Sequence, residues 1–438
     1  MKDLGSQPQE RIRNSAMTPF QIVAVSICLL INFLDGFDVL AIAFAAPEIA
    51  REWGLDAESL GIVFSAGLAG MVAGALLLSP LADRIGRRPL ILICLLIIGS
   101  GMLASAITSS MAQLVAMRVI TGVGVGGMLA SLTTMVAEYS NDRHRQFAIS
   151  VMQSGYPVGA IIAGVFSAYL LSHYDWRAIF VVGGVLSLAM IPIVAWRLPE
   201  SVEFLFHRRP SNALLQINKI LSRLNQQVLE HLPEEHASEA SKSAAFEVFS
   251  SVYRGRTFAI WIAFVALMSA FYFVTNWTPK ILTDAGLSRD AGISGGVLIA
   301  IGGVVGGLTL GLLSRRFLMN NIGATYMGLA VVSMITFGLL QFDLRIMLPV
   351  AFLIGFFVAG AIICLYALLP DLYPTRMRNS GAGWALGIGR LGAVVGPYVA
   401  GLLIDAGWQR SDYYFALSLP ILISVIAVLQ LRRLSKSQ

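Results

Sequence analysis

Two aspartates lie inside an apolar stretch that is long enough to cross a lipid bilayer. The segment INFLDGFDVLAIAF, residues 31–44, contains Asp35 and Asp38 three positions apart. A charged side chain at the centre of a bilayer costs about 2.5–3.5 kcal/mol on insertion scales, so such residues are kept where they have a use. Residues three apart share one helix face, and two carboxylates in one apolar site favour the neutral acid of at least one. The pair is therefore suited to bind and release a proton.

The other ionisable residues narrow the choice of proton carrier. Of the 25 Asp and Glu residues only these two lie well inside an apolar run, and no histidine does. We prefer Asp35 as the proton carrier and Asp38 as its coupled neighbour. The alternative for Asp38 is a permanent ion pair with Arg118, which lies at a comparable depth.

Arg390 is the other cation deep in an apolar run. Its planar guanidinium is suited to bind a carboxylate through two hydrogen bonds, which makes it the candidate anion anchor. The alternative is a structural ion pair with Asp35 or Asp38.

The whole chain is too apolar for an ordinary soluble protein, since 56% of its 438 residues are hydrophobic and 13% are charged. Apolar runs of at least ~18 residues predict membrane-spanning helices. The chain has twelve, at 19–46, 60–79, 89–107, 112–138, 146–171, 177–196, 257–279, 291–313, 321–341, 346–369, 378–404 and 413–431. The sequence therefore predicts an all-α membrane protein embedded in the lipid bilayer.

The twelve runs divide six and six around a polar segment. Residues 1–196 form the predicted N-terminal half, residues 197–256 a cytoplasmic central loop, and residues 257–438 the C-terminal half. Such a division is typical of transporters built from two repeated halves. Within the loop, ALLQINKILSRLNQQV (213–228) repeats apolar residues at helical spacing and predicts a short amphipathic helix.

The distribution of Lys and Arg predicts the orientation. Of these 31 residues, 23 fall on the tails and loops of the side that carries the termini and six on the opposite loops. Because positive charge accumulates on the cytoplasmic side, we expect both termini to be cytoplasmic and the protein to lie in the plasma membrane, the inner membrane of a bacterium. The net charge of +6 reflects this topology, so no nucleic-acid partner is predicted.

Several other kinds of chemistry are disfavoured. The three cysteines, Cys28, Cys94 and Cys364, lie inside predicted spans without metal-ligand spacing, so no disulfide framework, metal site or cofactor is predicted. GVGVGG (122–127) and GIGRLG (387–392) match a dinucleotide-binding string, but both lie inside apolar runs, where such glycines let helices pack closely. No nucleophile and base occur in a plausible soluble site, so an enzyme is not expected.

Two motifs carry a resemblance to a known family. LADRIGRR (81–88), between the second and third runs, resembles the signature loop of the major facilitator superfamily, and RVITGVGVGG from Arg118 resembles its fourth-helix motif. The twelve spans and their six-plus-six division extend the resemblance over the whole chain. It implies the major facilitator fold, with structural or gating roles for Asp83, Arg84, Arg87, Arg88, Arg118 and Glu138.

A narrower resemblance rests on three further segments. DGFD (35–38), FYFVTNWTPKIL (271–282) and LYPTRMRNSGAGWALGIGRLGAVVGP (372–397) together resemble the aromatic acid:proton symporters of the superfamily. The resemblance implies a monomer that imports a benzoate- or hydroxybenzoate-like carboxylate with a proton, by alternating access. The alternatives are transport of another organic acid such as muconate, of a sugar or of a drug, or a transporter-like chemosensor.

Aromatic residues near these motifs are candidate contacts for the ring of the substrate. Together with Arg390, the predicted substrate-binding residues are Tyr156, Tyr272, Tyr366 and Trp384. Packing is the alternative for Tyr156, Tyr366 and Trp384, and for Tyr272 the alternative is an aromatic belt at the membrane interface. Trp277 is expected in that belt.

Overall fold

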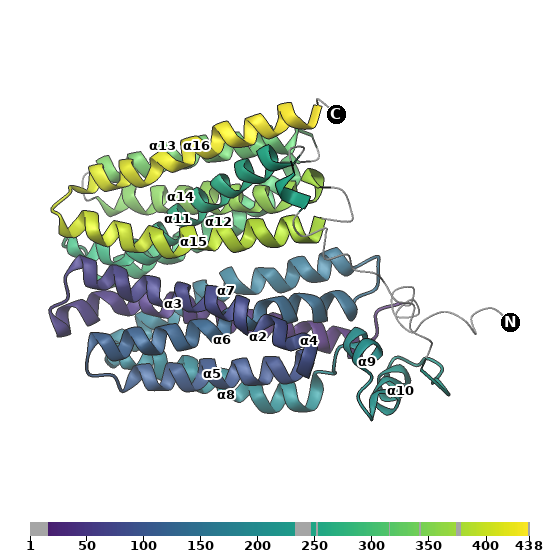
Figure 1. Ribbon diagram of the computed structural model, residues 1–438. Coiled ribbons are helices and arrows are strands. Elements are labelled where there is room, and N and C mark those ends of the chain that lie inside the picture. The colour runs from purple at the N-terminus through teal and green to yellow at the C-terminus, as the bar shows by residue number, and fades with distance from the viewer. Residues whose placement is uncertain are drawn as a thin grey trace.

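The computed structural model describes residues 16–232, 247–250, 253–314, 316–340, 343–373 and 378–436. Over these ranges the chain forms twelve helices that are long and apolar enough to cross a membrane, and no strand occurs. The long helices run roughly side by side along one axis (Figure 1). The predicted all-α architecture with twelve spans is therefore confirmed.

The helices fall into two groups of six. The first group is α2 (Pro19–Trp53), α3 (Ala57–Leu77), α5 (Arg87–Ala106), α6 (Met111–Glu138), α7 (Arg145–His173) and α8 (Arg177–Arg197). The second group is α11 (Arg254–Asp284), α12 (Arg289–Leu313), α13 (Met319–Leu339), α14 (Leu344–Leu372), α15 (Arg378–Asp405) and α16 (Arg410–Lys436). Within the described residues, five short helices lie between the long ones: η1 (Ser79–Leu81), α4 (Ala82–Ile85), α9 (Val202–Arg208), α10 (Ala213–Arg223) and η3 (Glu247–Phe249).

The first spanning helix, α2, begins and ends at residues suited to those positions. Thr18 caps its N-terminus in a capping box with Gln21, and Gly54 ends it with a left-handed backbone at φ 63°. The helix continues through Pro47 to Trp53, seven residues beyond the predicted span. The two aspartates therefore lie near the middle of α2, deeper than its predicted length implied.

Glycines set the closest helix contacts. A Cβ atom on Gly122 of α6 would lie 2.0 Å from the carbonyl oxygen of Gly67 in α3, and one on Gly392 of α15 would lie 2.0 Å from that of Val265 in α11. Any larger residue at either position would push the paired helices apart. The interpretation as packing motifs is confirmed for GVGVGG and for Gly389 and Gly392 of GIGRLG, whereas a Cβ atom on Gly387 would meet no atom of the described residues within 4 Å.

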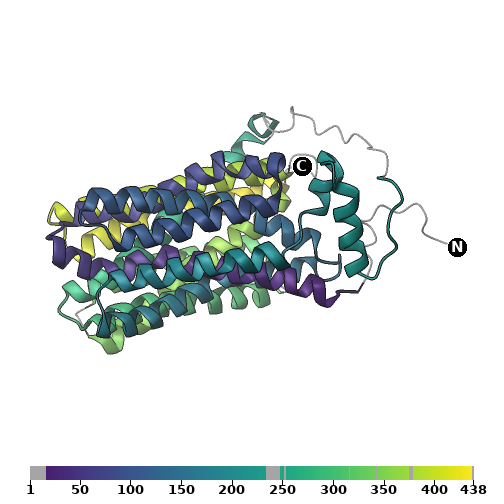
Figure 2. The same ribbon diagram turned by 90° about the horizontal axis from the view of Figure 1, so that it is seen from below.

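The segment after α8 forms two short helices at one end of the bundle, the α9–α10 end (Figures 1 and 2). The predicted amphipathic helix is present as α10, which buries Ile217, Ile220 and Leu221. It ends at Arg223, short of the predicted Val228, because Asn225 adopts a left-handed backbone at φ 55°. The helix α2 begins, and α16 ends, at this same end of the bundle (Figure 1).

The two halves contact each other toward the end opposite α9 and α10. Ser65 of α3 donates a hydrogen bond of 2.7 Å to the carbonyl oxygen of Val394 in α15. One helical turn away, Gly61 lies against Pro397 of α15, and Gly164 of α7 lies against Val297 of α12. The described bundle is therefore closed at the end away from α9 and α10.

Candidate functional site

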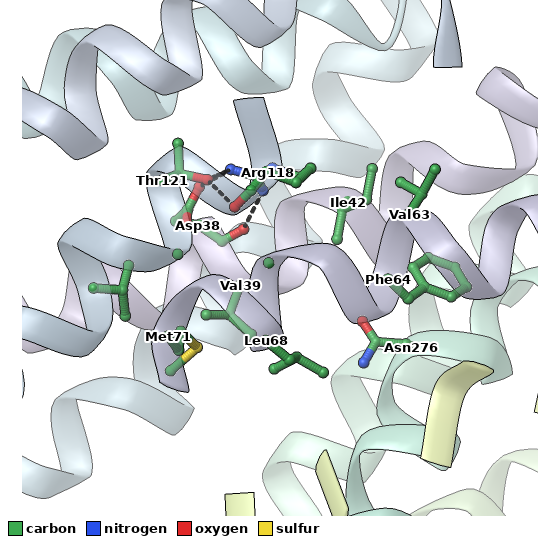
Figure 3. A pocket seen from close by; sticks show the side chains of 13 residues that line it. Asp38, Val39, Ile42, Val63, Phe64, Leu68, Met71, Arg118, Thr121 and Asn276 are labelled. Carbon is green, nitrogen blue, oxygen red and sulfur yellow. Dashed lines mark hydrogen bonds and ion pairs between the residues drawn. The ribbon is translucent and has the colours of Figure 1, made fainter. Parts of the chain in front are cut away.

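A buried ion pair joins α2 to α6. A guanidinium nitrogen of Arg118, Nη2, lies 2.8 Å from Oδ1 of Asp38 and 2.5 Å from Oγ1 of Thr121, as Figure 3 shows. Nη1 donates a longer bond of 3.3 Å to the carbonyl oxygen of Asp38, and the guanidinium carbon lies 5.3 Å from the centre of the Phe180 ring. The ion pair that the sequence left as an alternative for Asp38 is therefore formed.

Asp35 has a different environment from Asp38 although the two are three residues apart. Its side chain is buried, and among the described residues its Oδ2 has no hydrogen-bond partner. Asp38 interacts with it electrostatically, as the spacing predicts. A buried carboxylate without a counter-ion is costly, and binding a proton removes that cost. Of the two aspartates, Asp35 is the one whose surroundings suit reversible protonation.

A small cavity adjoins the ion pair. It has a volume of about 20 Å³ and is lined mainly by apolar side chains of α2, α3 and α6, with Asp38, Arg118 and Thr121 at one side (Figure 3). Asn276 of α11 is the lining residue contributed by the C-terminal half. Because ligand pockets for small molecules are on the order of 300 Å³ or more, this cavity fits water and not an aromatic acid. Sequence reasoning did not single out Asn276, because it carries no charge, although it lies within the segment FYFVTNWTPKIL.

Three predicted substrate contacts come together near Arg390. Tyr272 of α11 and Tyr366 of α14 both interact electrostatically with Arg390 of α15. Tyr156 of α7 interacts with Tyr272 and with the two aspartates. Tyr366 is surrounded by protein, yet it is 43% exposed, so it faces open space inside the bundle. Arg390 forms no ion pair with either aspartate within the described ranges, so the structural ion pair that the sequence left as its alternative is not formed there.

Trp384 lies elsewhere in the structure. Its ring packs at 6.0 Å from that of Trp261 and at 5.7 Å from that of Phe249. Phe249 belongs to η3, which leads into α11, so this aromatic cluster sits nearer the α9–α10 end than Arg390 does. The structure therefore groups Trp384 with Trp261 and Phe249 and not with the tyrosines around Arg390.

Trp277 is buried, so its predicted place in an interfacial belt is wrong. The residue is only 1% exposed, its Nε1 donates to the carbonyl oxygen of Pro397 at 3.0 Å, and its ring meets that of Phe64 edge-on at 5.2 Å. The physical reason is the length of α11, which continues to Asp284, past the predicted end at residue 279. Trp277 thus packs between the halves.

The loop LADRIGRR lies at the α9–α10 end and binds neighbouring backbone. The carboxylate of Asp83 forms an ion pair of 3.2 Å with Arg87. The backbone oxygen of Asp83 accepts a hydrogen bond of 2.7 Å from Nε of Arg208. Arg88 donates to the carbonyl oxygen of Ala195. Arg84 is exposed, as is the Asp83 side chain at 71%. Glu138 accepts bonds of 2.8 Å from the hydroxyl of Ser201.

Glu200 joins this loop to the segment after α8, and sequence reasoning missed it. Its Oε1 accepts from the backbone N–H groups of Arg87 at 3.0 Å, Arg88 at 3.3 Å and Ser201 at 2.7 Å, so it caps the start of α5. Burial raises the pKa of the Glu200 carboxyl, and these backbone hydrogen bonds oppose the rise. A Cβ atom on Gly86, at φ 105°, would lie 2.3 Å from Glu200 Oε2, so only glycine fits there.

Comparison with known proteins identifies the family. The family model described as Major Facilitator Superfamily matches residues 28–349. The chain belongs to the major facilitator superfamily. It is 33% identical to a gallate transporter of Pseudomonas putida over 95% of this chain and 93% of that protein. It is also 33% identical to the 4-hydroxybenzoate transporter PcaK of Pseudomonas putida over 96% of this chain and 94% of that protein.

These relatives place the chain among the aromatic acid transporters of the superfamily, the family that its motifs resemble. The fold agrees with a solved structure, a bacterial homolog of the human lysosomal transporter Spinster in an inward-facing and occupied conformation, with a TM-score of 0.70. That match has 15% identity and covers 96% of this chain and 97% of the other. The family match of residues 28–349 includes the aspartate pair and Arg118, whereas Tyr366 and Arg390 lie beyond it.

Proposed function

We propose that the protein is a proton-coupled symporter that imports an aromatic carboxylate of the benzoate or hydroxybenzoate class by alternating access. The observation that carries this proposal is the buried carboxylate oxygen of Asp35, which has no partner among the described residues and lies beside an aspartate already paired with arginine. A proton is the smallest partner that could neutralise it. The named substrates of the relatives, gallate and 4-hydroxybenzoate, supply the substrate class.

The anion site is proposed at Arg390. Its guanidinium binds the substrate carboxylate, while Tyr272 and Tyr366, which already interact with it, contact the ring and the carboxylate. Aromatic rings pack well against one another in offset or edge-to-face arrangements, so tyrosines suit an aromatic substrate. Tyr156 completes the site from the other half, and Trp384 serves as a contact nearer the α9–α10 end.

The proton site is proposed at Asp35. Arg118 holds Asp38 and keeps that charge neutralised, so the proton binds to the neighbour that lacks an arginine. Moving one proton together with a monoanion transfers no net charge. The pH gradient, and not the membrane potential, then drives uptake.

Alternating access is proposed from where the halves touch. Contacts such as that of Ser65 with Val394 close the bundle away from α9 and α10, and Tyr366 stays exposed inside it. By the distribution of Lys and Arg, the α9–α10 end is cytoplasmic, with both termini on that side of the inner membrane. This arrangement corresponds to a release state. In the opposite state the exposed Asp83, with Arg84, Arg87 and Arg88, gates the cytoplasmic end.

Uptake into vesicles that contain the purified protein tests the proposal. Labelled benzoate, 4-hydroxybenzoate, gallate, muconate and a sugar are each presented with an inward proton gradient, and the same panel is repeated after a protonophore abolishes the gradient. We expect the aromatic acids to accumulate only while the proton gradient is present. We also expect the transporting unit to be a monomer. Binding without accumulation would indicate a chemosensor, and preferred uptake of muconate or sugar would indicate another transporter.

A further inference from the structure

Tyr156 lies directly against the aspartate segment. A Cβ atom on Gly36, the residue that follows Asp35, would come within 2.0 Å of the backbone oxygen of Tyr156. The backbones of α2 and α7 therefore pack closely against each other at the point where α2 carries its two carboxylates. Tyr156 thus has a fixed position relative to Asp35 and Asp38.

The hydroxyl of Tyr156 is buried and forms no well-aligned hydrogen bond with any described residue. It interacts with Tyr272 of the C-terminal half, and Tyr272 in turn interacts with Arg390. The backbone oxygen of Tyr272 accepts a bond of 2.8 Å from Asn276, which lines the cavity next to Asp38. Tyr156 and Tyr272, one from each half, thus lie between the aspartates and the proposed anion anchor.

We propose that Tyr156 is a positioning residue that couples proton binding at Asp35 to anion binding at Arg390. A phenol carries one O–H proton and donates one hydrogen bond at a time. While Asp35 is charged, this O–H is held toward the carboxylate. Once Asp35 is neutral, the O–H turns to Tyr272, and the O–H of Tyr272 is then directed at the substrate carboxylate on Arg390. The step reorients hydroxyl groups and transfers no proton.

The charged and titratable groups around Tyr156 point to Asp35 as the group it senses. On α2, Tyr156 interacts electrostatically with Asp35 and Asp38. Arg118 of α6 neutralises Asp38 through their ion pair. From α11 Tyr156 meets Tyr272. Cys94 of α5 also interacts electrostatically with the Asp35 carboxylate. The ionisable residues of α8 and α12 that the structure describes lie at the helix ends, where Arg177 and Asp290 begin their helices or nearly so.

The inference rests on the proposed function, and binding measurements at two pH values test it. Calorimetry with 4-hydroxybenzoate on purified wild type, Tyr156→Phe and Tyr366→Phe compares Kd at two pH values. One lies below and one above the midpoint of the Asp35 titration in wild type, and both are high enough for the substrate carboxylate to stay charged. For Tyr156→Phe we expect binding about tenfold weaker at the lower pH and little changed at the higher, since one hydrogen bond is lost only when Asp35 is neutral. Tyr366→Phe, the matched control, should weaken binding equally at both. Equal weakening by Tyr156→Phe at both pH values, or none at either, would overturn the coupling role.

A second measurement needs no substrate, so it separates this inference from the proposed function. Infrared spectroscopy follows the carboxylic acid band of Asp35, assigned by its loss in Asp35→Asn, as pH rises. The charged carboxylate loses a hydrogen-bond donor in Tyr156→Phe, so its acid band should persist to higher pH than in wild type, and Tyr366→Phe should match wild type. Identical titrations of Tyr156→Phe and wild type would refute the link. A wild type that fails to accumulate aromatic acids would instead refute the proposed function.

Discussion

The guanidinium of Arg118 lies 2.8 Å from the carboxylate of Asp38, and each of the two side chains is only 3% exposed. This pair, between α2 and α6, distinguishes the two aspartates of the DGFD segment. One has a permanent cationic partner and the other does not. We propose a division of roles in which Asp38 holds Arg118 in place and Asp35 exchanges the proton.

The ion pair predicts a strong dependence of stability on both partners. Arg118→Met or Asp38→Asn alone should lower the free energy of unfolding by about 3–5 kcal/mol, because a buried partner is left without its counterpart. The double variant should lose much less than the sum. Thermal unfolding of the purified variants in detergent checks this. Additive losses would show that the two side chains do not stabilise each other.

The proposed role of Arg390 as anion anchor predicts how its replacement changes the affinity and the selectivity for the substrate. Arg390→Lys should weaken binding of benzoate-type acids by about tenfold or more, because an ammonium cannot reproduce the planar two-bond contact with a carboxylate. The variant should also discriminate less between an acid and its uncharged amide. Calorimetric titration of each ligand measures both effects. Unchanged affinity for the acid would assign Arg390 to the scaffold and direct the search for the anion site toward Arg118.

The Asp83 side chain is exposed at the α9–α10 end, far from the tyrosines around Arg390. Asp83→Asn should therefore slow turnover several-fold and leave substrate affinity nearly unchanged. Transport rates and binding constants measured on the same preparation separate the two quantities. A large change in affinity with normal turnover would reverse the assignment.

Glu200 predicts a pH dependence of stability. Burial raises the pKa of the Glu200 carboxyl, so the folded protein holds the carboxyl proton more tightly than the unfolded chain does. The stability that this proton contributes is therefore present at acid pH and is lost as the pH rises through the raised pKa. Glu200→Gln remains neutral and keeps an oxygen for the three backbone donors. As the pH rises from about 5 to about 8, the unfolding temperature of Glu200→Gln should therefore fall less than that of wild type.

The matched variant Glu200→Ala leaves those backbone N–H groups unsatisfied and should cost about 1–3 kcal/mol over the whole pH range. Scanning fluorimetry at several pH values compares the three proteins. Parallel curves for wild type and Glu200→Gln would show that the carboxyl does not titrate in this range.

The sequence predicted most of the fold because a membrane-spanning helix is recognised from a local signal, a run of about twenty consecutive apolar residues. It also located Asp35, Asp38 and Arg118, since a charge in an apolar run stands out. It did not decide between an ion pair and a proton site for Asp38, because that choice depends on the position of α6 beside α2.

Other features depend on contacts between distant segments and carry little local signal. Glu200 lies in a polar loop, where an acidic residue is unremarkable until the backbone donors of Arg87 and Arg88 are seen around it. Trp277 was misplaced because aromatic residues near a predicted span end are typical of the interface. The helix α11 instead continues to Asp284, so Trp277 lies seven residues before its end.

The central claim is that Asp35 carries the coupling proton, and transport by Asp35→Asn in vesicles tests it most directly. Labelled 4-hydroxybenzoate is followed in two modes, accumulation driven by an inward proton gradient and exchange against internal unlabelled substrate at equal pH. The account predicts that Asp35→Asn retains exchange, because the neutral amide resembles the protonated acid, and loses gradient-driven accumulation. Acid-stimulated accumulation at the wild-type level in Asp35→Asn would contradict it.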